Sequence, residues 1–325
     1  MTTTSGLQRL RFILNTYYSG PQAWFYLADD RGYFRDEGLQ IDFTEGDTAA
    51  NAVPKLASGA FDVGYGDMNA LIELAAQRPG EAPIAVYAMH NQSPYTIAVP
   101  ADGPIHTPAD LRGRKLVSHV NDAAWRMFPE FAHANGFDPA EVTVEFSDLR
   151  HREIVPLMLQ GRWDGLFGFV NTVAAGTMEA GLDPKACLRH LEWRHHVPSL
   201  YGAALMVTPQ LRRERPEVVA GLVRAVNRGV ADAVADLDAA IDAVARRNPN
   251  IDRVANRARL AGTLALEMGH AEGARHGIGD IDEARLAEAI ACISAAKHFA
   301  TAPSAAQVFD RGFLPATEQR VRSLG

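Results

Sequence analysis

The sequence contains an internal repeat, and this repeat limits the possible folds more than any other feature of the chain. Shifting the sequence by 102 residues aligns two segments without a gap. The aligned pairs are Val53 with Val155, Pro54 with Pro156, Gly59 with Gly161, Phe61 with Trp163, Asp62 with Asp164, Gly66 with Gly168 and Asn69 with Asn171. Coincidence is the alternative, but Gly, Pro and Asp specify backbone conformations, so their joint recurrence favours duplication. The repeat predicts two similar lobes.

Short β-type runs alternate with amphipathic helical stretches up to residue 207. Strands are expected at residues 11–15, 40–43, 61–65, 115–118, 142–146 and 163–168, and helices at 23–31, 49–58, 121–135 and before 160. This alternation is typical of parallel strands covered by helices, so the predicted fold class is α/β. Gly59 and Gly161 are each expected to end a helix in the left-handed conformation.

Size and charge exclude several functions. A chain of 325 residues exceeds one typical domain, and a net charge of -7 without a Lys/Arg-rich run argues against a nucleic-acid partner. No stretch approaches the roughly 20 apolar residues of a membrane span, and the first residues lack a signal-peptide pattern. We therefore expect either a cytosolic protein or one whose leader has been removed. Cys187 and Cys292 match neither a metal nor a disulfide pattern.

Both copies of the repeat place polar residues directly after a strand. Ligands of open parallel sheets bind beyond the carboxyl ends of the strands, so these positions are equivalent and are expected to face one another across a cleft. Ordinary turn residues are the alternative. The candidate ligand contacts here are Gly66, Asp67 and Met68 in the first copy, with Phe169 and Asn171 in the second.

Three segments resemble the solute-binding proteins of sulfonate, taurine and thiamine-pyrimidine uptake, called the NMT1/THI5-like group. They are ADDRGYFRDEGL at residues 28–39, GAFDVG at 59–64 and VTP at 207–209. The resemblance implies a two-lobed periplasmic-binding-protein type II fold, each lobe a mixed sheet flanked by helices. Residues 8–96 with 200–325 would form lobe I, including a helical C-terminal part, and residues 97–199 would form lobe II.

The resemblance also implies a function. Such a protein would be a periplasmic or otherwise extracytoplasmic monomer that delivers a small molecule to the membrane permease and ATPase of an ABC importer, without a cofactor or metal. A sulfonate or taurine ligand, and a cytoplasmic enzyme of thiamine-pyrimidine synthesis, are the alternatives. The sequence contains no G-x-S-x-G elbow, phosphate loop, dinucleotide fingerprint or H-E-x-x-H motif.

In lobe I, aromatic and amide residues surround the start of the first expected helix. Aromatic faces stack on planar ligands, whereas amides select their polar edges. The candidates are Asn15, Tyr17, Tyr18, Gln22 and Trp24, with Glu45 and Thr48 after the next strand and His90, Asn91 and Tyr201 near the segments that cross between the lobes. Asp47 is expected to cap the following helix rather than bind ligand.

In lobe II, the candidates Asn121, Asp122 and Trp125 open a helix. The Asp122 carboxylate would oppose an anion at this place unless it serves only as a cap. Asp67 and Glu45 add further negative charge to the expected cleft, and the possible compensating cations are Arg126, Arg150, His151 and Arg152. This distribution of charge favours an aromatic heterocycle such as a thiamine-precursor pyrimidine as the ligand. His90 and His119 are the candidate acid–base groups of an enzyme, although a hydrogen-bonding role is favoured for both.

Overall fold

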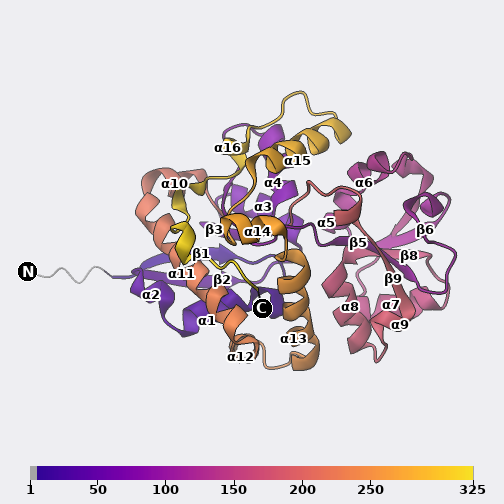
Figure 1. The fold of residues 1–325 in the computed structure, drawn as a ribbon, viewed down its shortest axis with the longest axis horizontal. Coiled ribbons are helices and arrows are strands. Elements are labelled where there is room, and N and C mark those ends of the chain that lie inside the picture. Colours follow the sequence, from indigo (N-terminus) through magenta and orange to yellow (C-terminus); the bar gives the residue numbers. More distant parts are fainter. Residues whose placement is uncertain (1–5, 325) are drawn as a thin grey trace, which may run out of the picture.

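The computed structural model describes residues 6–324, and these residues form two lobes of unequal size that lie side by side (Figure 1). Each lobe is built on a five-stranded sheet. The strands of the first sheet are β1 (Gln8–Ile13), β2 (Leu39–Thr44), β3 (Val63–Asp67), β4 (Ile84–Ala88) and β10 (Ala203–Val207). Those of the second are β5 (Tyr95–Pro100), β6 (Lys115–Ser118), β7 (Thr143–Phe146), β8 (Gly165–Phe169) and β9 (Leu188–Glu192).

The two sheets have the same topology. The first has the order β2-β1-β3-β10-β4 and the second β7-β6-β8-β5-β9, with β10 and β5 each antiparallel to both neighbours. The antiparallel strand of each sheet therefore follows a crossing from the other lobe, at residues 89–94 and 193–202. The two crossings lie side by side, because the Gly202 amide donates to the His90 carbonyl at 3.1 Å and the His90 amide donates to Ala203 at 2.9 Å. Both sheets are mixed, as the resemblance implied.

Helices cover both faces of each sheet. Those of the first 200 residues are α1 (Ala23–Asp30), α2 (Tyr33–Asp36), α3 (Ala49–Ala57), α4 (Met68–Gln77), α5 (Ala123–Arg126), α6 (Phe128–Ala134), α7 (His151–Leu159), α8 (Val170–Glu179) and α9 (Pro184–Cys187). The remainder are α10 (Pro209–Glu214), α11 (Pro216–Ala235), α12 (Leu237–Arg247), α13 (Arg253–Gly262), α14 (Ala271–His276), α15 (Glu283–Ala296) and α16 (Ala305–Val308). None of the helices in residues 6–324 combines the length and hydrophobicity that a membrane crossing requires.

The repeat is confirmed, because three consecutive elements recur at the same shift of 102 residues. Helix α3 corresponds to α7, β3 to β8 and α4 to α8, with identical lengths in each pair. The backbone φ angles of Gly59 and Gly161 are +78° and +88°, the left-handed conformation expected after each first helix. One expectation was wrong in detail: the helix predicted at 121–135 is interrupted between α5 and α6, next to Pro129, whose ring nitrogen cannot donate a hydrogen bond.

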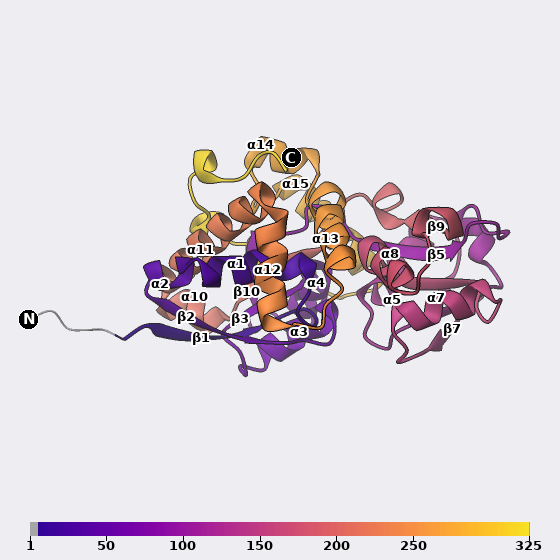
Figure 2. The ribbon, with the colours of Figure 1, turned by 90° about the horizontal axis from the view of Figure 1, so that it is seen from below.

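The core of lobe I follows the two-residue period of its strands. Along β10, Leu205 and Val207 pack beneath α1 and α11, whereas Ala204 and Met206 pack on the opposite face beneath α3 and α4. The apolar residues of α11 belong to the first of these cores, as its helical spacing predicted. Further along the chain, α13 contributes Leu260 to this core and also lies against α8 of lobe II, which the two ribbon views show from different sides (Figure 2).

Candidate functional site

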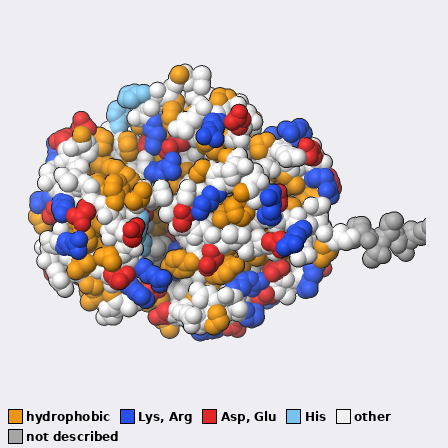
Figure 3. All heavy atoms as spheres, turned by 180° about the vertical axis from the view of Figure 1, so that it is seen from behind, with side chains coloured by type: hydrophobic (Ala, Val, Ile, Leu, Met, Phe, Trp, Pro, Cys, Tyr) orange, Lys and Arg blue, Asp and Glu red, His pale blue; other side chains and the backbone are white. Residues whose placement is uncertain are grey.

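A cavity of about 850 Å³ lies between the lobes. Its walls come from three parts of the chain: the strand ends of lobe I, those of lobe II, and the C-terminal stretch 248–267 that contains α13. On the face shown in Figure 3, a hollow between the lobes contains histidine atoms and has acidic and basic side chains at its rim. The volume lies within the range of small-molecule sites.

The sheet topology explains why these residues meet. Residues 15–17 follow β1, residues 45–49 follow β2, and residues 119–123 follow β6. Since parallel strands share one carboxyl edge, the segments that follow them collect at the same edge of each sheet. The two crossings hold these edges together across the gap between the lobes.

Seven of the residues predicted to contact a ligand line this cavity. They are Asn15, Tyr17, Glu45, Thr48, His90, Asp122 and Phe169. Their contact with a ligand remains a prediction, although the cavity brings them together. Tyr17 keeps 55% of its surface exposed, an unusual state for an aromatic side chain that leaves its ring available.

The other predicted aromatics of lobe I do not line the cavity. Trp24 is fully buried, with its ring 6.4 Å from that of Tyr65, because α1 turns this side chain into the core. Tyr18 packs on the same core and donates its hydroxyl to the Phe43 carbonyl at 3.4 Å. Gln22 is also buried and donates to Asn15, so it supports a residue of the cavity wall. Trp24, Tyr18 and Gln22 therefore lie outside the cavity wall.

The strand end at Gly66 is also buried beneath neighbouring helices. A Cβ at Gly66 would lie 3.0 Å from Val53 of α3, and Met68 belongs to the core. The Asp67 carboxylate caps α4 by accepting from the amides of Asn69 and Ala70 at 2.9 Å each. Burial raises the pKa of Asp67 to about 6, against the opposing effect of a hydrogen bond from Tyr95. Gly66, Asp67 and Met68 thus have structural roles and do not line the cavity.

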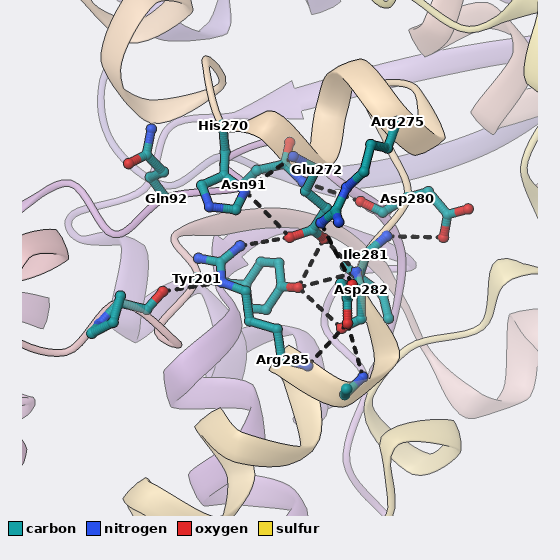
Figure 4. Close-up of polar contacts among 12 residues, drawn as sticks. Asn91, Gln92, Tyr201, His270, Glu272, Arg275, Asp280, Ile281, Asp282 and Arg285 are labelled. Carbon is teal, nitrogen blue, oxygen red and sulfur yellow. Dashed lines mark hydrogen bonds and ion pairs between the residues drawn. The ribbon is translucent and has the colours of Figure 1, made fainter.

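Asn91 and Tyr201 anchor the C-terminal segment to the crossings (Figure 4). The Tyr201 hydroxyl donates to Glu272 at 2.8 Å, and the Arg285 guanidinium lies 4.2 Å above the Tyr201 ring. Asn91 donates to the carbonyl of Asp280 at 3.1 Å. Both side chains are buried in this network, so neither lines the cavity.

Of the remaining lobe II candidates, Asn121 is exposed outside the cavity and Trp125 packs on Phe128 at 5.9 Å. Asn171 is buried and donates from Nδ2 to Oε1 of Glu267 at 3.0 Å. It does not line the cavity itself, but Glu267 does. Asn171 therefore joins the two lobes beside the cavity.

Helix caps account for several of the acidic residues. Asp122 caps α5, accepting from Ala124 and Trp125, and burial raises its pKa. The expectation for Asp47 was wrong, because Thr48 accepts from the Asn51 amide as the cap of α3. Asp47 instead forms an ion pair with Lys55 at 2.9 Å.

Three histidines, His90, His119 and His151, line the cavity. His119 lies 2.8 Å from the Leu149 carbonyl, and its ring centre lies 5.1 Å from that of His151. Burial, the neighbouring His119 and the charge of Arg259 lower the pKa of His151 to about 3. Burial also lowers the pKa of His90, against the opposing charge of Glu267. His90 and His151 are therefore uncharged hydrogen-bonding groups at neutral pH.

Sequence reasoning missed the C-terminal wall of the cavity. Asp252, Asn256 and Arg259 line it from α13 and its cap, together with Glu267 beyond the helix. Spacings of four and three residues place these three polar side chains on one helix face. This polar stripe is visible in the sequence and could have indicated a wall of the site. Within residues 6–324, no cluster of three or more His, Cys, Asp and Glu side chains is suited to hold a metal ion.

A known family model matches more than half of the chain. The NMT1/THI5 like family model matches residues 21–240. The riboflavin-binding protein RibY of Chloroflexus aurantiacus is 23% identical over 223 residues, which are 67% of this chain and 60% of RibY. The chain therefore spans less than two thirds of the length of this relative.

Solved structures share the fold. The alkanesulfonate-binding protein SsuA of Xanthomonas axonopodis pv. citri, bound to MOPS, superposes with a TM-score of 0.69 at 15% identity, covering 94% of this chain and 99% of SsuA. The periplasmic aliphatic sulphonate-binding protein SsuA of Escherichia coli gives 0.67 at 14%, covering 93% and 92%. The desulfurization enzyme DszB gives 0.58 at 13%, covering 94% and 97%. At these identities the similarity establishes the fold alone.

Proposed function

This chain belongs to the NMT1/THI5-like family, and from this premise we propose that it is an extracytoplasmic solute-binding protein of an ABC importer. It captures a small molecule between its lobes and presents the closed form to the permease, whose ATPase partner drives uptake. The similarity to SsuA of Escherichia coli, a periplasmic aliphatic sulphonate-binding protein, supports the location and the general role.

The observation that carries this proposal is the shared construction of the cavity. Its walls combine lobe I, lobe II and the C-terminal stretch, so a ligand inside touches both lobes, between which the chain passes at the two crossings. A ligand that contacts both lobes favours the closed arrangement by its additional contacts there. Capture and signalling of occupancy then require no covalent step.

An aromatic heterocycle is the ligand class that the cavity walls favour. Tyr17 and Phe169 offer ring faces from lobe I and lobe II, and His119 and His151 add two more. Asn15, Thr48 and Asn250 supply neutral polar groups for the edges of a planar molecule. RibY, whose name describes riboflavin binding, supports the same class. The cavity volume also accommodates molecules larger than a single pyrimidine ring.

A binding panel tests the proposal. Thermal shift and calorimetry would compare riboflavin, a thiamine-precursor pyrimidine, taurine and an alkanesulfonate, since a ligand that binds only the native state raises the melting temperature. We expect a heterocycle to bind and the Tyr17→Ala variant to bind it roughly tenfold more weakly. Leu7→Ala, which shortens an exposed side chain outside the cavity, is the matched control.

The other outcomes are equally informative. If only taurine or the alkanesulfonate stabilises the protein, the ligand is a sulfonate and the proposed heterocycle is wrong. Equal affinities of the wild type and Tyr17→Ala would remove Tyr17 from the site. Conversion of the bound compound would identify an enzyme of this fold instead of a transport protein.

A further inference from the structure

Three arginines line the cavity without an ion-pair partner. In the described part of the chain, no carboxylate lies within 4.0 Å of the guanidinium groups of Arg150, Arg152 or Arg259. The contrast on α13 is clear, because Arg253 pairs with Asp242 and Arg257 pairs with Asp238. Arg259, on the same helix, faces the cavity instead.

The acidic residues of the cavity, in contrast, mostly have partners within the protein. Asp47 pairs with Lys55, Glu45 accepts from the Tyr18 amide at 2.7 Å, and Asp252 caps α13. Glu267 accepts from Asn171 and lies 3.4 Å from His90 Nε2. Asp122 caps α5, and Glu179 is exposed at the end of α8. These contacts occupy carboxylate oxygens within the protein, whereas the three guanidinium groups keep their donors available to a ligand.

Arg259 is also the most buried of the three cations. Arg150 and Arg152 are exposed, whereas Arg259 is partly buried and its Nε atom has no hydrogen-bond partner. Two further residues of the cavity wall have a buried ring nitrogen without a hydrogen-bond partner, Nδ1 of His90 in lobe I and Nε2 of His151 in lobe II. The Arg259 charge lowers the pKa of both histidines, so its guanidinium lies within electrostatic range of each lobe.

Buried polar groups without partners cost free energy in the empty protein, and a ligand that supplies the missing partners recovers it. A guanidinium binds a carboxylate, phosphate or sulfonate through charge-assisted hydrogen bonds, which neutral groups cannot match. Arg152 on α7 of lobe II can add a second positive charge at the opposite wall of the same cavity.

We propose that Arg259 binds an anionic group of the ligand between the lobes, so that the transported compound is an aromatic heterocycle bearing a phosphate, carboxylate or sulfonate. This inference rests on the proposed function and specifies its ligand. Asp122 was expected to oppose an anionic ligand unless it serves only as a cap. Its carboxylate does cap α5, and the arginines remain available to bind an anion.

Small anions test the site directly, since they carry the recognised group alone. Melting temperatures would be measured with orthophosphate, sulfate and acetate at matched ionic strength, for the wild type, Arg259→Gln and Arg257→Gln. We expect at least one anion to stabilise the wild type and Arg257→Gln, and to bind Arg259→Gln at least tenfold more weakly. The preferred anion identifies which of the three groups the ligand carries.

A matched pair of larger probes extends the test to the heterocycle. Riboflavin and riboflavin 5′-phosphate differ only by the phosphate group. Calorimetry should show that Arg259→Gln weakens the binding of riboflavin 5′-phosphate more than the binding of riboflavin. Failure of all three small anions to stabilise the wild type, or equal stabilisation of Arg259→Gln, would overturn the inference. If neutral heterocycles still bind, the proposed transport function stands; if no compound of either set binds, that function fails as well.

Discussion

The Asn171 side chain donates a hydrogen bond of 3.0 Å to the Glu267 carboxylate, and this bond joins lobe II to the C-terminal segment of lobe I. Both side chains are almost fully buried, and Glu267 also lies 3.4 Å from Nε2 of His90 beside the first crossing. The bond thus connects the wall of the cavity with the segment about which the lobes would move. If the lobes close on a ligand as proposed, this bond is positioned to couple the cavity to that closure.

Removing this bond is expected to weaken both stability and ligand binding. In Asn171→Ala the buried Glu267 carboxylate loses a donor, at an expected cost of about 1–3 kcal/mol in the free energy of unfolding. Denaturant unfolding measures this cost, and calorimetry should show weaker ligand binding because the closed form is less favourable.

Asn135→Ala is the matched control, because Asn135 donates to Phe131 within lobe II. It should leave ligand affinity at the wild-type value. If Asn171→Ala and Asn135→Ala bind ligand equally well, the bond to Glu267 has no role in closure.

Gly262, the last residue of α13, lies directly against Asn171 of lobe II. A Cβ at this position would lie 2.2 Å from Oδ1 of Asn171, a distance that real structures do not tolerate. Gly262→Ala should therefore displace the Asn171 side chain from Glu267, which lowers the melting temperature and reduces ligand affinity. Gly6→Ala is the control, since nothing lies within 4 Å of its added Cβ. An unchanged melting temperature and affinity in Gly262→Ala would contradict the close contact.

A buried acidic cluster should give the stability a characteristic pH dependence. Lys297 Nζ lies 2.8 Å from the carboxylate of Glu73 on α4 of lobe I and 3.9 Å from that of Glu130 on α6 of lobe II. These contacts join the lobes at a second place. Burial raises the pKa of Glu130 to about 7, against the opposing charge of Lys297. The folded protein therefore holds this proton more tightly than the unfolded chain, in which an ordinary Glu pKa applies.

The stabilisation from protonated Glu130 is thus complete at acidic pH and is lost as the pH rises through about 7. Glu130→Gln should remove this decline and, at pH 8, be more stable than the wild type by about 2 kcal/mol, as unfolding curves at several pH values would show. Glu288→Gln, at an exposed position of α15, should retain the decline. A Glu130→Gln variant with the same pH profile as the wild type would exclude Glu130 as its source.

The sequence allowed the duplicated architecture to be predicted because the repeated residues fix backbone conformation. Gly59 and Gly161 have the left-handed conformation that only glycine adopts readily, and the elements after them begin and end in register. The site was harder to predict. Trp24 and Tyr17 lie in the same loop-to-helix segment, and only the packing of α1 determines that one is buried and the other exposed. Arg259 was missed because its position beside lobe II depends on how α13 packs against α8.

Native mass spectrometry of the complex is the most direct test of whether this protein binds its ligand without altering it. The compound that gives the largest thermal stabilisation would be incubated with the protein, and both the complex and the released compound would be weighed. We predict one molecule bound per chain and release of that molecule at its original mass. Release of a product of different mass would show that the interlobe cavity is an active site and would contradict the assignment as a binding protein.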